Sequence, residues 1–405
     1  MKVAEHVRHV SDAERRARLT LRHRLAPHSR TDDVVAVADD LVALHSTDPV
    51  TVYLSAAVRM RSPALDAVST ALYDERTLLR HHAMRRTLWV FGRRHAALAH
   101  HAATLDVAAV QRRDLMNQLG AAGIADPAAW FDEAARAVLD LLAQRGPTTA
   151  RDIGTALPQL SGTVLPIGPG SYPAHSRVLL VLGFEGRVLR ARPTGTWING
   201  QYRWAAAGDW LPGALGGPLD RRTAAAGLAR AYLHAFGPAT RDDLRWWAGW
   251  TVATTKAALA DVGAVTVSLD GGGTGYLLPD DADPVGDPGP SVALLPGLDP
   301  TTMGWKARDW YLEPAAARLL FDRNGNGGPA IWVDGRIVGS WVQRPDGTIA
   351  TRICVDPGPG TAALAGIEAA ATRIRELLGD VRFSVRYPAP VQPQLLGGAE
   401  PAPGR

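Results

Sequence analysis

The stretch Gly146-Pro147-Thr148-Thr149-Ala150-Arg151-Asp152-Ile153 returns in register as Gly237-Pro238-Ala239-Thr240-Arg241-Asp242-Asp243-Leu244. Each copy follows an Ala- and Leu-rich run that predicts a helix, at residues 134–144 and 224–236. Each copy precedes a second apolar run and then a Gly-bearing stretch typical of β-structure. The repeated order predicts a helix, a turn, two helices and a hairpin, which is a winged helix written twice. The alternative is that a helical protein punctuated by proline shows such an echo by chance.

Both copies carry the signals of a helix start. Thr149 and Thr240 are the expected N-caps, because a hydroxyl can accept from an orphan N–H of the first turn. Asp152 and Asp243 stand three residues later, where a capping box places its acidic partner. A third helix and a hairpin follow, expected at residues 175–182, 187–192 and 200–204 in the first copy and at 251–261, 265–269 and 276–278 in the second.

The remaining sequence divides at Gly- and Pro-rich breaks. The start of a helix is expected at Ser29 to Asp33, another helix from Ala64 to Leu72, and a strand at Thr87 to Phe91, so a third, less regular module is expected there. The expected segments are 1–113 (first module), 117–127 (linker), 128–210 (second module), 219–280 (third module), 291–387 (β-rich, with a closing helix at 361–378 and a last strand at 381–387) and 388–405 (disordered tail).

Bulk composition narrows the class of protein. The 405 residues are 46% hydrophobic, which is ordinary for a globular protein of two to four domains. No apolar run approaches the roughly 18 residues of a membrane span, and the charged first 24 residues lack the core of a secretory signal. The single Cys354 excludes internal disulfides and is typical of a reducing cytoplasm, so a cytoplasmic protein is expected.

Charge is unevenly distributed around a net value of +4. Residues 76–113 hold eight Arg and one acid, Asp106, whereas residues 261–300 hold seven Asp and no Lys or Arg. A basic face beside an acidic one is what a DNA-binding surface with a solvated back shows. Solvated helix faces are the alternative interpretation of the Arg residues.

Four segments resemble the family of the bacterial DNA glycosylases AlkZ and YcaQ. They are Leu44-His45-Ser46-Thr47-Asp48-Pro49, then Arg76 through Leu88 with Arg80, Arg85 and Arg86, then Leu294-Leu295-Pro296-Gly297-Leu298-Asp299-Pro300 followed by Arg308, and finally Trp332 through Trp341. The resemblance covers most of the chain. It implies an α+β fold of three tandem winged-helix modules around a DNA-sized cleft, with a small C-terminal β-barrel-like region. It also implies monofunctional excision of bulky or crosslinked N7-alkylated purines without a metal or an organic cofactor.

The chain differs from these relatives at the active position. AlkZ-like members carry Gln-x-Gln there and YcaQ-like members Gln-x-Asp, whereas this chain carries His45-Ser46-Thr47. Some members have His at the first position. Two functions therefore stay open: a DNA glycosylase, for general repair or for self-resistance to a genotoxin, or a non-catalytic winged-helix protein such as a regulator or a lesion-binding shield. In a third interpretation, the winged helices bind other proteins and do not bind DNA.

The residue types at 45–48 suit the chemistry. An N7-alkylpurine is already cationic, so the site must stabilise an oxocarbenium-like sugar and direct a water to it. In an extended segment His45 and Thr47 point to one side, where His45 could act as a base or a hydrogen-bond acceptor and Thr47 could orient the water. Asp48 could add negative charge near the sugar. The structural alternatives are a histidine that ends an Asp39 to Leu44 helix, a structural Thr47, and an Asp48 that caps the helix beginning at Pro49.

Basic residues are the expected contacts to double-stranded DNA. Phosphate contacts position a protein without reading sequence, as a lesion enzyme requires. The candidates are Arg76, Arg80, Arg85, Arg86, Arg190, Arg192, Lys306 and Arg308. Phosphate-loop, zinc-protease and Cys-cluster motifs are absent, and paired histidines such as His81-His82 lack matching carboxylates, so no metal is expected. A monomer is expected, since repeated modules need no second copy to cover DNA.

Overall fold

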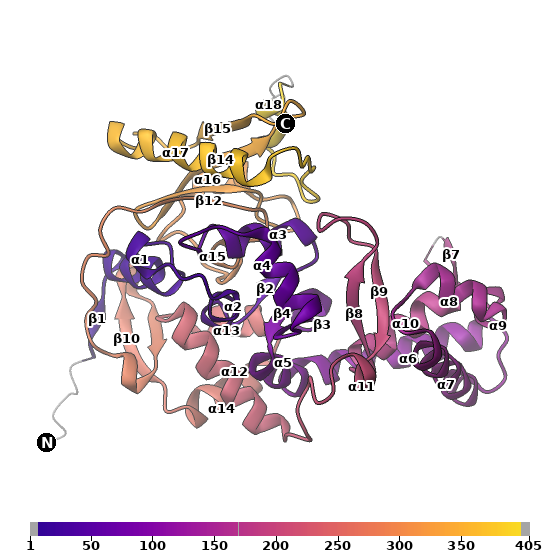
Figure 1. Cartoon of the computed structure of the whole chain (residues 1–405). Helices are drawn as coiled ribbons and strands as arrows, with labels where there is room; N and C mark the ends of the chain where they lie inside the picture. Colours follow the sequence, from indigo (N-terminus) through magenta and orange to yellow (C-terminus); the bar gives the residue numbers. More distant parts are fainter. Residues whose placement is uncertain (1–6, 169, 398–405) are drawn as a thin grey trace, which may run out of the picture. The chain divides into compact units, whose positions relative to one another are not determined.

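The computed structural model describes residues 7–168 and 170–397 of the chain, which divides into two compact units (Figure 1). Unit 1 combines Met1–Val68 with Ala229–Arg405, and unit 2 is Ser69–Leu228. Each unit mixes helices with small sheets, so the α+β class is confirmed.

Unit 1 contains two sheets. In the first, β1 pairs in parallel with β10, and β10 pairs antiparallel with β11. In the second, β12, β13, β14 and β15 follow one another as antiparallel neighbours, and α17 packs on β12. The elements are β1 (His9–Val10), α1 (Asp12–Arg22), η1 (Pro27–Ser29), α2 (Val34–Asp40), β2 (Leu44–His45), α3 (Pro49–Ala57), α13 (Arg241–Ala248), α14 (Val252–Asp261), β10 (Val265–Leu269), η5 (Asp270–Gly272), β11 (Thr274–Leu277), η6 (Pro279–Asp281), β12 (Val292–Leu295), α15 (Pro300–Met303), α16 (Pro314–Leu320), β13 (Ala330–Val333), β14 (Arg336–Gln343), β15 (Ile349–Ile353), α17 (Thr361–Leu378) and α18 (Gln392–Leu395).

Unit 2 is built around a helical core. Its elements are η2 (Thr70–Asp74), β3 (Leu78–His82), η3 (Met84–Arg86), β4 (Leu88–Gly92), α5 (Arg93–Ala99), η4 (His100–Thr104), α6 (Leu105–Ala121), α7 (Pro127–Arg145), β5 (Thr148–Thr149), α8 (Ala150–Ala156), α9 (Pro158–Gly162), β6 (Val164–Ile167), β7 (Gly170–Pro173), α10 (Ala174–Phe184), β8 (Val188–Pro193), β9 (Tyr202–Ala206) and α11 (Ala207–Trp210). Two helices cross the unit boundaries, α4 (Leu65–Ser69) and α12 (Arg221–Phe236).

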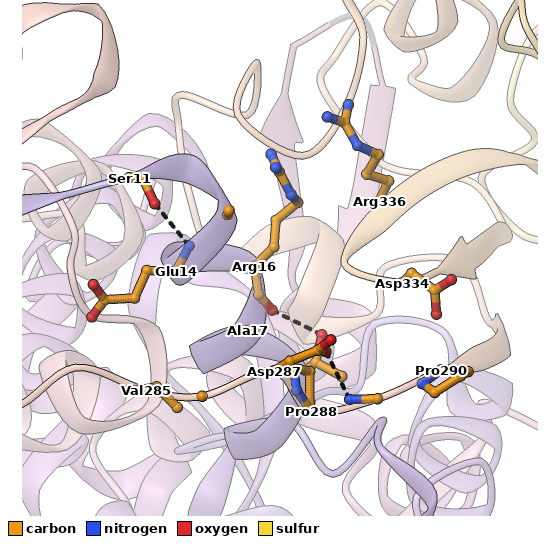
Figure 2. A pocket seen from close by; sticks show the side chains of 14 residues that line it. Ser11, Glu14, Arg16, Ala17, Val285, Asp287, Pro288, Pro290, Asp334 and Arg336 are labelled. Atoms are coloured by element: carbon orange, nitrogen blue, oxygen red, sulfur yellow. Dashed lines mark hydrogen bonds between the residues drawn. The ribbon is translucent and has the colours of Figure 1, made fainter.

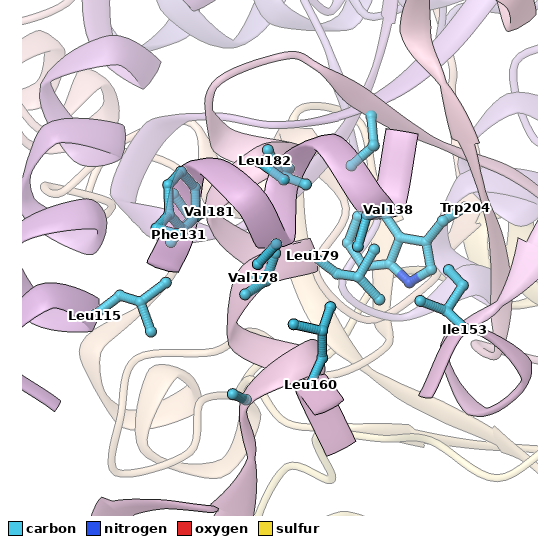
Figure 3. Close-up of a cluster of buried hydrophobic side chains, with 14 of the residues drawn as sticks. Leu115, Phe131, Val138, Ile153, Leu160, Val178, Leu179, Val181, Leu182 and Trp204 are labelled. Carbon is cyan, nitrogen blue, oxygen red and sulfur yellow. The ribbon is translucent and has the colours of Figure 1, made fainter. Parts of the chain in front are cut away.

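Apolar side chains from α6, α7, α8 and α10 fill the core of unit 2 (Figure 3). Leu115, Phe131 and Val178 are fully buried in it. Trp204 of β9 packs in the same cluster, so the sheet β5-β9-β8 also contributes to this core. Helix spacing explains the pattern, because buried residues such as Ala134, Ala135 and Val138 recur on one face of α7. This core fixes where β8 and β9 present their outward-facing residues.

The two repeated stretches fold with the same connectivity. In the first copy α7, β5, α8, α10, β8 and β9 follow in order, and β5 pairs antiparallel with β9. In the second copy α12, α13, α14, β10 and β11 follow in order, and Ala239 bridges Tyr276 where the first copy has the β5–β9 pair. Thr149 and Thr240 cap α8 and α13 as expected, and Thr240 with Asp243 forms a complete capping box. An unexpected hairpin, β6 with β7, is inserted before α10.

Several sequence expectations are wrong. The β-rich region is an open four-stranded sheet, since no pairing closes β12 onto β15 in the described ranges, so it is not a barrel. The helix expected at Asp39 to Leu44 ends at Asp40. The expected linker at 117–127 begins inside α6, whose buried Leu115 and Leu119 hold it helical as far as Ala121. Residues 381–387 form no strand.

The disordered tail expected at 388–405 is also partly wrong. Residues 388–397 carry α18, and Gln392 and Leu395 are buried there. A hydrogen bond also holds this segment, since Arg344 Nε donates to the carbonyl oxygen of Leu395 at 3.0 Å. The rest of the expected tail, 398–405, lies outside the described residues.

Candidate active site

The segment 44–49 lies between a short strand and a helix. Leu44 and His45 form β2, and Pro49 is the first residue of α3, where its fixed φ and missing N–H cost nothing. His45 is 4% exposed and Asp48 8%, and Thr47 is half-buried. The three predicted catalytic residues therefore sit at a strand-to-helix junction, largely shielded from bulk solvent.

His45 and Thr47 are joined by a local contact. The backbone N–H of Thr47 points at Nδ1 of His45 at 3.4 Å. An Nδ1 that accepts from a backbone N–H cannot carry the proton of a neutral imidazole, so that proton lies on Nε2. In this arrangement the Nδ1 lone pair of His45 is directed at the Thr47 N–H, whereas the sequence suggested a base or a hydrogen-bond acceptor for a water.

Thr47 is held through its backbone, whereas its side-chain hydroxyl makes no hydrogen bond to a described residue. Its carbonyl oxygen accepts from Nη1 of Arg386 at 3.0 Å. Its Oγ1 is buried and makes no hydrogen bond with any residue that the structure describes. A buried hydroxyl without a partner is costly in a folded protein, and sites that bind a ligand or a water are where such groups are retained.

Asp48 caps α3. Its Oδ1 accepts the N–H of Val50 at 3.1 Å, and its Oδ2 is 3.4 Å from the N–H of Arg386. Burial raises the pKa of Asp48 above its ordinary value, although these two N–H groups act against the shift. The cap that the sequence offered as the structural alternative is therefore present, and Asp48 also ties the segment to Arg386.

Helix α3 is anchored to another of the four resembling segments. Thr51 Oγ1 donates to the carbonyl oxygen of Gly297 at 2.6 Å, and Ser55 Oγ donates to Oδ2 of Asp299 at 2.6 Å. Arg59, which is fully buried, donates to both carboxylate oxygens of Asp299 at 2.7 and 2.9 Å. Burial alone would raise the pKa of Asp299, but Arg59 and the donated hydrogen bonds lower it below its ordinary value.

The fourth resembling segment completes this support. Trp341 in β14 donates from Nε1 to the carbonyl oxygen of Leu295 in β12 at 2.7 Å. β12, β13 and β14 are consecutive neighbours in the sheet. Three segments that the sequence could only place far apart are thus linked in unit 1.

The arginines of unit 2 differ widely in accessibility. Arg86 and Arg192 are exposed, and Arg192 forms an ion pair with Asp74 at 2.7 Å. Arg76 is half-buried over the ring of Trp210 at 4.0 Å. Arg85 and Arg86 occupy the tip between β3 and β4 with φ values of 55° and 64°, a left-handed conformation that non-glycine residues seldom adopt.

Arg80 is a correction to the predicted DNA contacts. It is 2% exposed, donates to the hydroxyl of Tyr73 at 2.5 Å, and lies 4.3 Å from the centre of the Tyr202 ring. A side chain this deeply buried cannot make an outer contact to a DNA backbone. Its position on β3 places it among inward-facing residues, which the sequence pattern of spaced arginines did not reveal.

The two basic residues predicted in unit 1 flank the loop after α15. Lys306 is exposed, and its backbone N–H donates to Oδ1 of Asp243 at 2.9 Å. Arg308 is half-buried and donates from Nε to the carbonyl oxygen of Thr302 at 2.9 Å. Trp305 is buried against Phe236 at a ring distance of 5.1 Å, so it is a packing residue and is not placed to wedge between bases.

Two cavities of unit 1 lie away from His45. One of about 700 Å³ is lined by α1, the loop at 285–290 and the β13–β14 turn, and in Figure 2 Arg16 and Arg336 extend toward the same side of it. The other, about 610 Å³, contains the predicted Lys306 together with Arg241 and Tyr276. Neither contains His45, Thr47 or Asp48.

Arg386 is the site residue that sequence reasoning missed. It contacts both Thr47 and Asp48 from 338 or more residues away in the chain. No motif marked it, because it lies in a stretch whose alternating pattern predicted only a strand. Its role arises from packing of the C-terminal segment, which a single sequence does not disclose.

Two general features complete the description. In the described part of the chain no group of three or more His, Cys, Asp or Glu side chains could hold a metal ion. No helix among the described residues is long and apolar enough to cross a membrane.

The chain is an α+β protein whose segment at 44–49 lies at a buried junction between β2 and α3. A family model described as DNA glycosylase AlkZ-like matches residues 38–377, and the chain belongs to that family. The solved structure of the DNA glycosylase AlkZ from Streptomyces sahachiroi has the same fold, with a TM-score of 0.72 and 19% identity over 91% of this chain and 97% of that one. A comparison with curated protein sequences finds no match.

Proposed function

We propose that this chain is a monofunctional DNA glycosylase that removes bulky or crosslinked N7-alkylpurines from double-stranded DNA in the cytoplasm. Family membership supports a DNA glycosylase role in repair. The alkylated purine is the finer part of the proposal. It follows from a site that offers a neutral hydrogen-bonding group, a hydroxyl and a capped carboxylate, because a cationic leaving group needs little acid assistance.

The observation that carries the proposal is the pairing of His45 with the unpartnered hydroxyl of Thr47. The contact from the Thr47 N–H fixes the imidazole with its proton on Nε2. Thr47 Oγ1 is buried and free of protein partners in the described residues, so it can accept from and donate to a water. The two groups together position a water next to the sugar of a flipped nucleotide, with Asp48 holding the segment in place.

We also propose that the two repeats are winged helices. The strand β5 pairs with β9, and the Ala239–Tyr276 bridge occupies the corresponding place in the second copy. A winged helix differs from a plain helix-turn-helix by the β-hairpin after its third helix, which is β8–β9 in the first copy and β10–β11 in the second, and a strand between the first two helices pairs with this hairpin. The exposed face of α14, which includes Lys256, is then the helix presented to DNA in the second copy.

The proposed contacts to DNA phosphates come from exposed and half-buried cations. Arg76, Arg85, Arg86 and Arg192 supply them in unit 2, and Lys306 and Arg308 supply them in unit 1. Arg85 and Arg86 carry the strongest support, because two adjacent residues in a left-handed conformation cost free energy at the tip of a hairpin. Sites of that kind are retained where function requires them.

The test is excision from defined substrates. Duplex DNA carrying an N7-methylguanine, a bulky N7-alkylguanine or an interstrand crosslink is incubated with protein, and abasic sites are measured against undamaged duplex. Abasic sites from the bulky or crosslinked adduct support the proposal. Salt-dependent binding of all duplexes without any excision would instead support a non-catalytic DNA-binding protein.

A further inference from the structure

One arginine of unit 2 has no partner for its charge. Arg190 lies in β8 directly opposite Trp204 of β9, and its guanidinium carbon is 3.5 Å from the centre of that indole ring. Its Nε is buried. No described residue forms a hydrogen bond or an ion pair with the Arg190 side chain.

A second cation lies on the same side of the sheet. Tyr202 stands two residues before Trp204 in β9, so their side chains share one face. Arg190 covers Trp204, and Arg80 covers Tyr202. Each of the two rings therefore carries one guanidinium group on its face. Arg80 belongs to β3 and Arg190 to β8, and these two strands are in contact.

The other buried arginines show what is missing. Arg59 is paired with both oxygens of Asp299, and Arg18 with Glu14 and Asp281. Burying a guanidinium without a carboxylate is expensive, because its hydration is lost and nothing replaces it. Burial lowers the pKa of Arg190 to about 9; the positive charge of Arg80 lowers it further, and Tyr202 acts in the opposite direction.

The carboxylate of Asp74 is engaged by another arginine of β8. Asp74 pairs with Arg192, which lies two residues beyond Arg190 in β8 and also covers the ring of Tyr73 at 4.9 Å. The positive charge of Arg190 is left without a carboxylate partner among the described residues. An anion from outside the chain would balance it.

We propose that Arg190 binds one phosphate group of a DNA backbone. The inference rests on the proposed function and deepens it, since it assigns a specific subsite within the DNA-binding surface. A guanidinium held flat on an aromatic ring presents its N–H groups along its edge in a fixed fork, which matches two phosphate oxygens. The partial burial of Arg190 strengthens such an interaction.

The choice of phosphate over a carboxylate ligand follows from the proposed substrate. A DNA phosphodiester carries one full negative charge and is held in place by its neighbours, so each contact adds affinity in a salt-dependent way. Free inorganic phosphate has the same chemistry. The two sources are separated by experiment, because only the DNA backbone changes the salt dependence of duplex binding.

The first arm of the test measures duplex binding by fluorescence anisotropy at several NaCl concentrations. Arg190→Leu is compared with wild type and with Arg187→Leu, which removes a partly exposed arginine just before β8 that is paired with Glu185. We expect Arg190→Leu to weaken binding roughly tenfold and to reduce the slope of log K against log salt by about 0.9, the value for one lost phosphate contact. Unchanged affinity and slope would overturn the proposal.

The second arm measures thermal unfolding with and without inorganic phosphate, at ionic strength matched with NaCl. Phosphate is expected to raise the Tm of wild type, while Arg190→Leu melts at or above the wild-type temperature without phosphate and does not respond to it. A variant that melts lower would show that Arg190 is structural and would count against the proposal. Arg190→Gln, which keeps hydrogen-bonding groups but no charge, gives the same comparison if the leucine variant does not fold.

Excision is recorded in parallel so that the two proposals fail separately. A wild-type protein without excision activity, whose DNA binding still loses about 0.9 in slope on Arg190→Leu, contradicts the glycosylase proposal and supports the phosphate subsite. Active excision with an unchanged salt slope on Arg190→Leu supports the glycosylase proposal and contradicts the phosphate subsite. A phosphate-dependent Tm with unchanged DNA binding would assign the site to free phosphate and would overturn the DNA assignment.

Discussion

Arg386 donates from Nη1 to the carbonyl oxygen of Thr47 at 3.0 Å, across 339 residues of sequence. Its backbone N–H also lies 3.4 Å from Asp48. The C-terminal segment therefore holds the proposed catalytic segment in position. Arg386 acts through the backbone of Thr47, which makes it a positioning residue.

Arg386→Ala should slow excision about tenfold at saturating enzyme, because a small displacement of the water-binding groups lowers the rate strongly. The measurement is single-turnover excision together with duplex affinity. Affinity should change little. Arg382→Ala is the matched control, since Arg382 bonds to Gly379 and Val381 and does not contact residues 45–48. Equal slowing by both substitutions would show a general effect of the C-terminal segment.

Thr47→Val separates a catalytic hydroxyl from a structural one. Valine keeps the shape and removes Oγ1, which is buried and without a partner among the described residues. If the hydroxyl orients water, excision should fall on the order of a hundredfold while the free energy of unfolding stays equal or rises. Thr47→Ser should retain most activity. Full activity in Thr47→Val would refute a role for the hydroxyl.

The buried pair of Arg59 and Asp299 should dominate the stability of unit 1. Arg59→Met leaves a carboxylate buried without its bidentate partner, at a cost of about 3–5 kcal/mol in the free energy of unfolding. Arg59→Lys should recover little, because an ammonium cannot reproduce the fork. Chemical denaturation measures both. A cost below about 1 kcal/mol, typical of surface pairs, would contradict the pairing described here.

Buried histidines make unit 2 sensitive to acid. Burial lowers the pKa of His82 to about 3 and of His100 to about 4, and it lowers that of His81 well below its ordinary value. These groups stay neutral in the folded chain but gain protons when unfolded. Their contribution is thus present above about pH 6.5 and is lost as pH falls from there toward 4.

The expected loss is up to about 1.4 kcal/mol per pH unit for each histidine within that window. The measurement is the free energy of unfolding of the full chain between pH 7 and pH 4. His82→Phe keeps the packing on Phe184 and Trp204. It should reduce the slope of the unfolding free energy against pH by the contribution of one titrating histidine. His28→Phe, at an exposed position, is the control. Equal slopes in all three proteins would rule out the mechanism.

Local signals predicted much of the secondary structure. The caps at Thr149 and Thr240 are confirmed, and so is the closing helix from Thr361 to Leu378, because each depends on residues within one or two turns. The linker expected at 117–127 failed where Leu119 extends α6 into a buried contact. The strand expected at 381–387 failed because its alternating pattern found no neighbouring strand to pair with.

The site was predictable only in its local part. Residues 45–48 were found through a resemblance carried by a short motif, but their support comes from Asp299 and Arg386, which are distant in sequence. Long-range packing is invisible to periodicity and spacing. The same limit explains Arg80, whose place in the charge pattern indicated a surface although β3 turns it inward.

The most direct test of the central claim is single-turnover excision of a bulky N7-alkylguanine from duplex DNA by wild type, His45→Ala and His45→Gln. Binding is verified for each protein by anisotropy. We predict excision by wild type, a loss of about 10²–10⁴-fold in His45→Ala with affinity retained, and partial recovery in His45→Gln, which restores a hydrogen-bonding donor. Unchanged excision by His45→Ala, or no excision by a wild type that binds the duplex, would contradict the account.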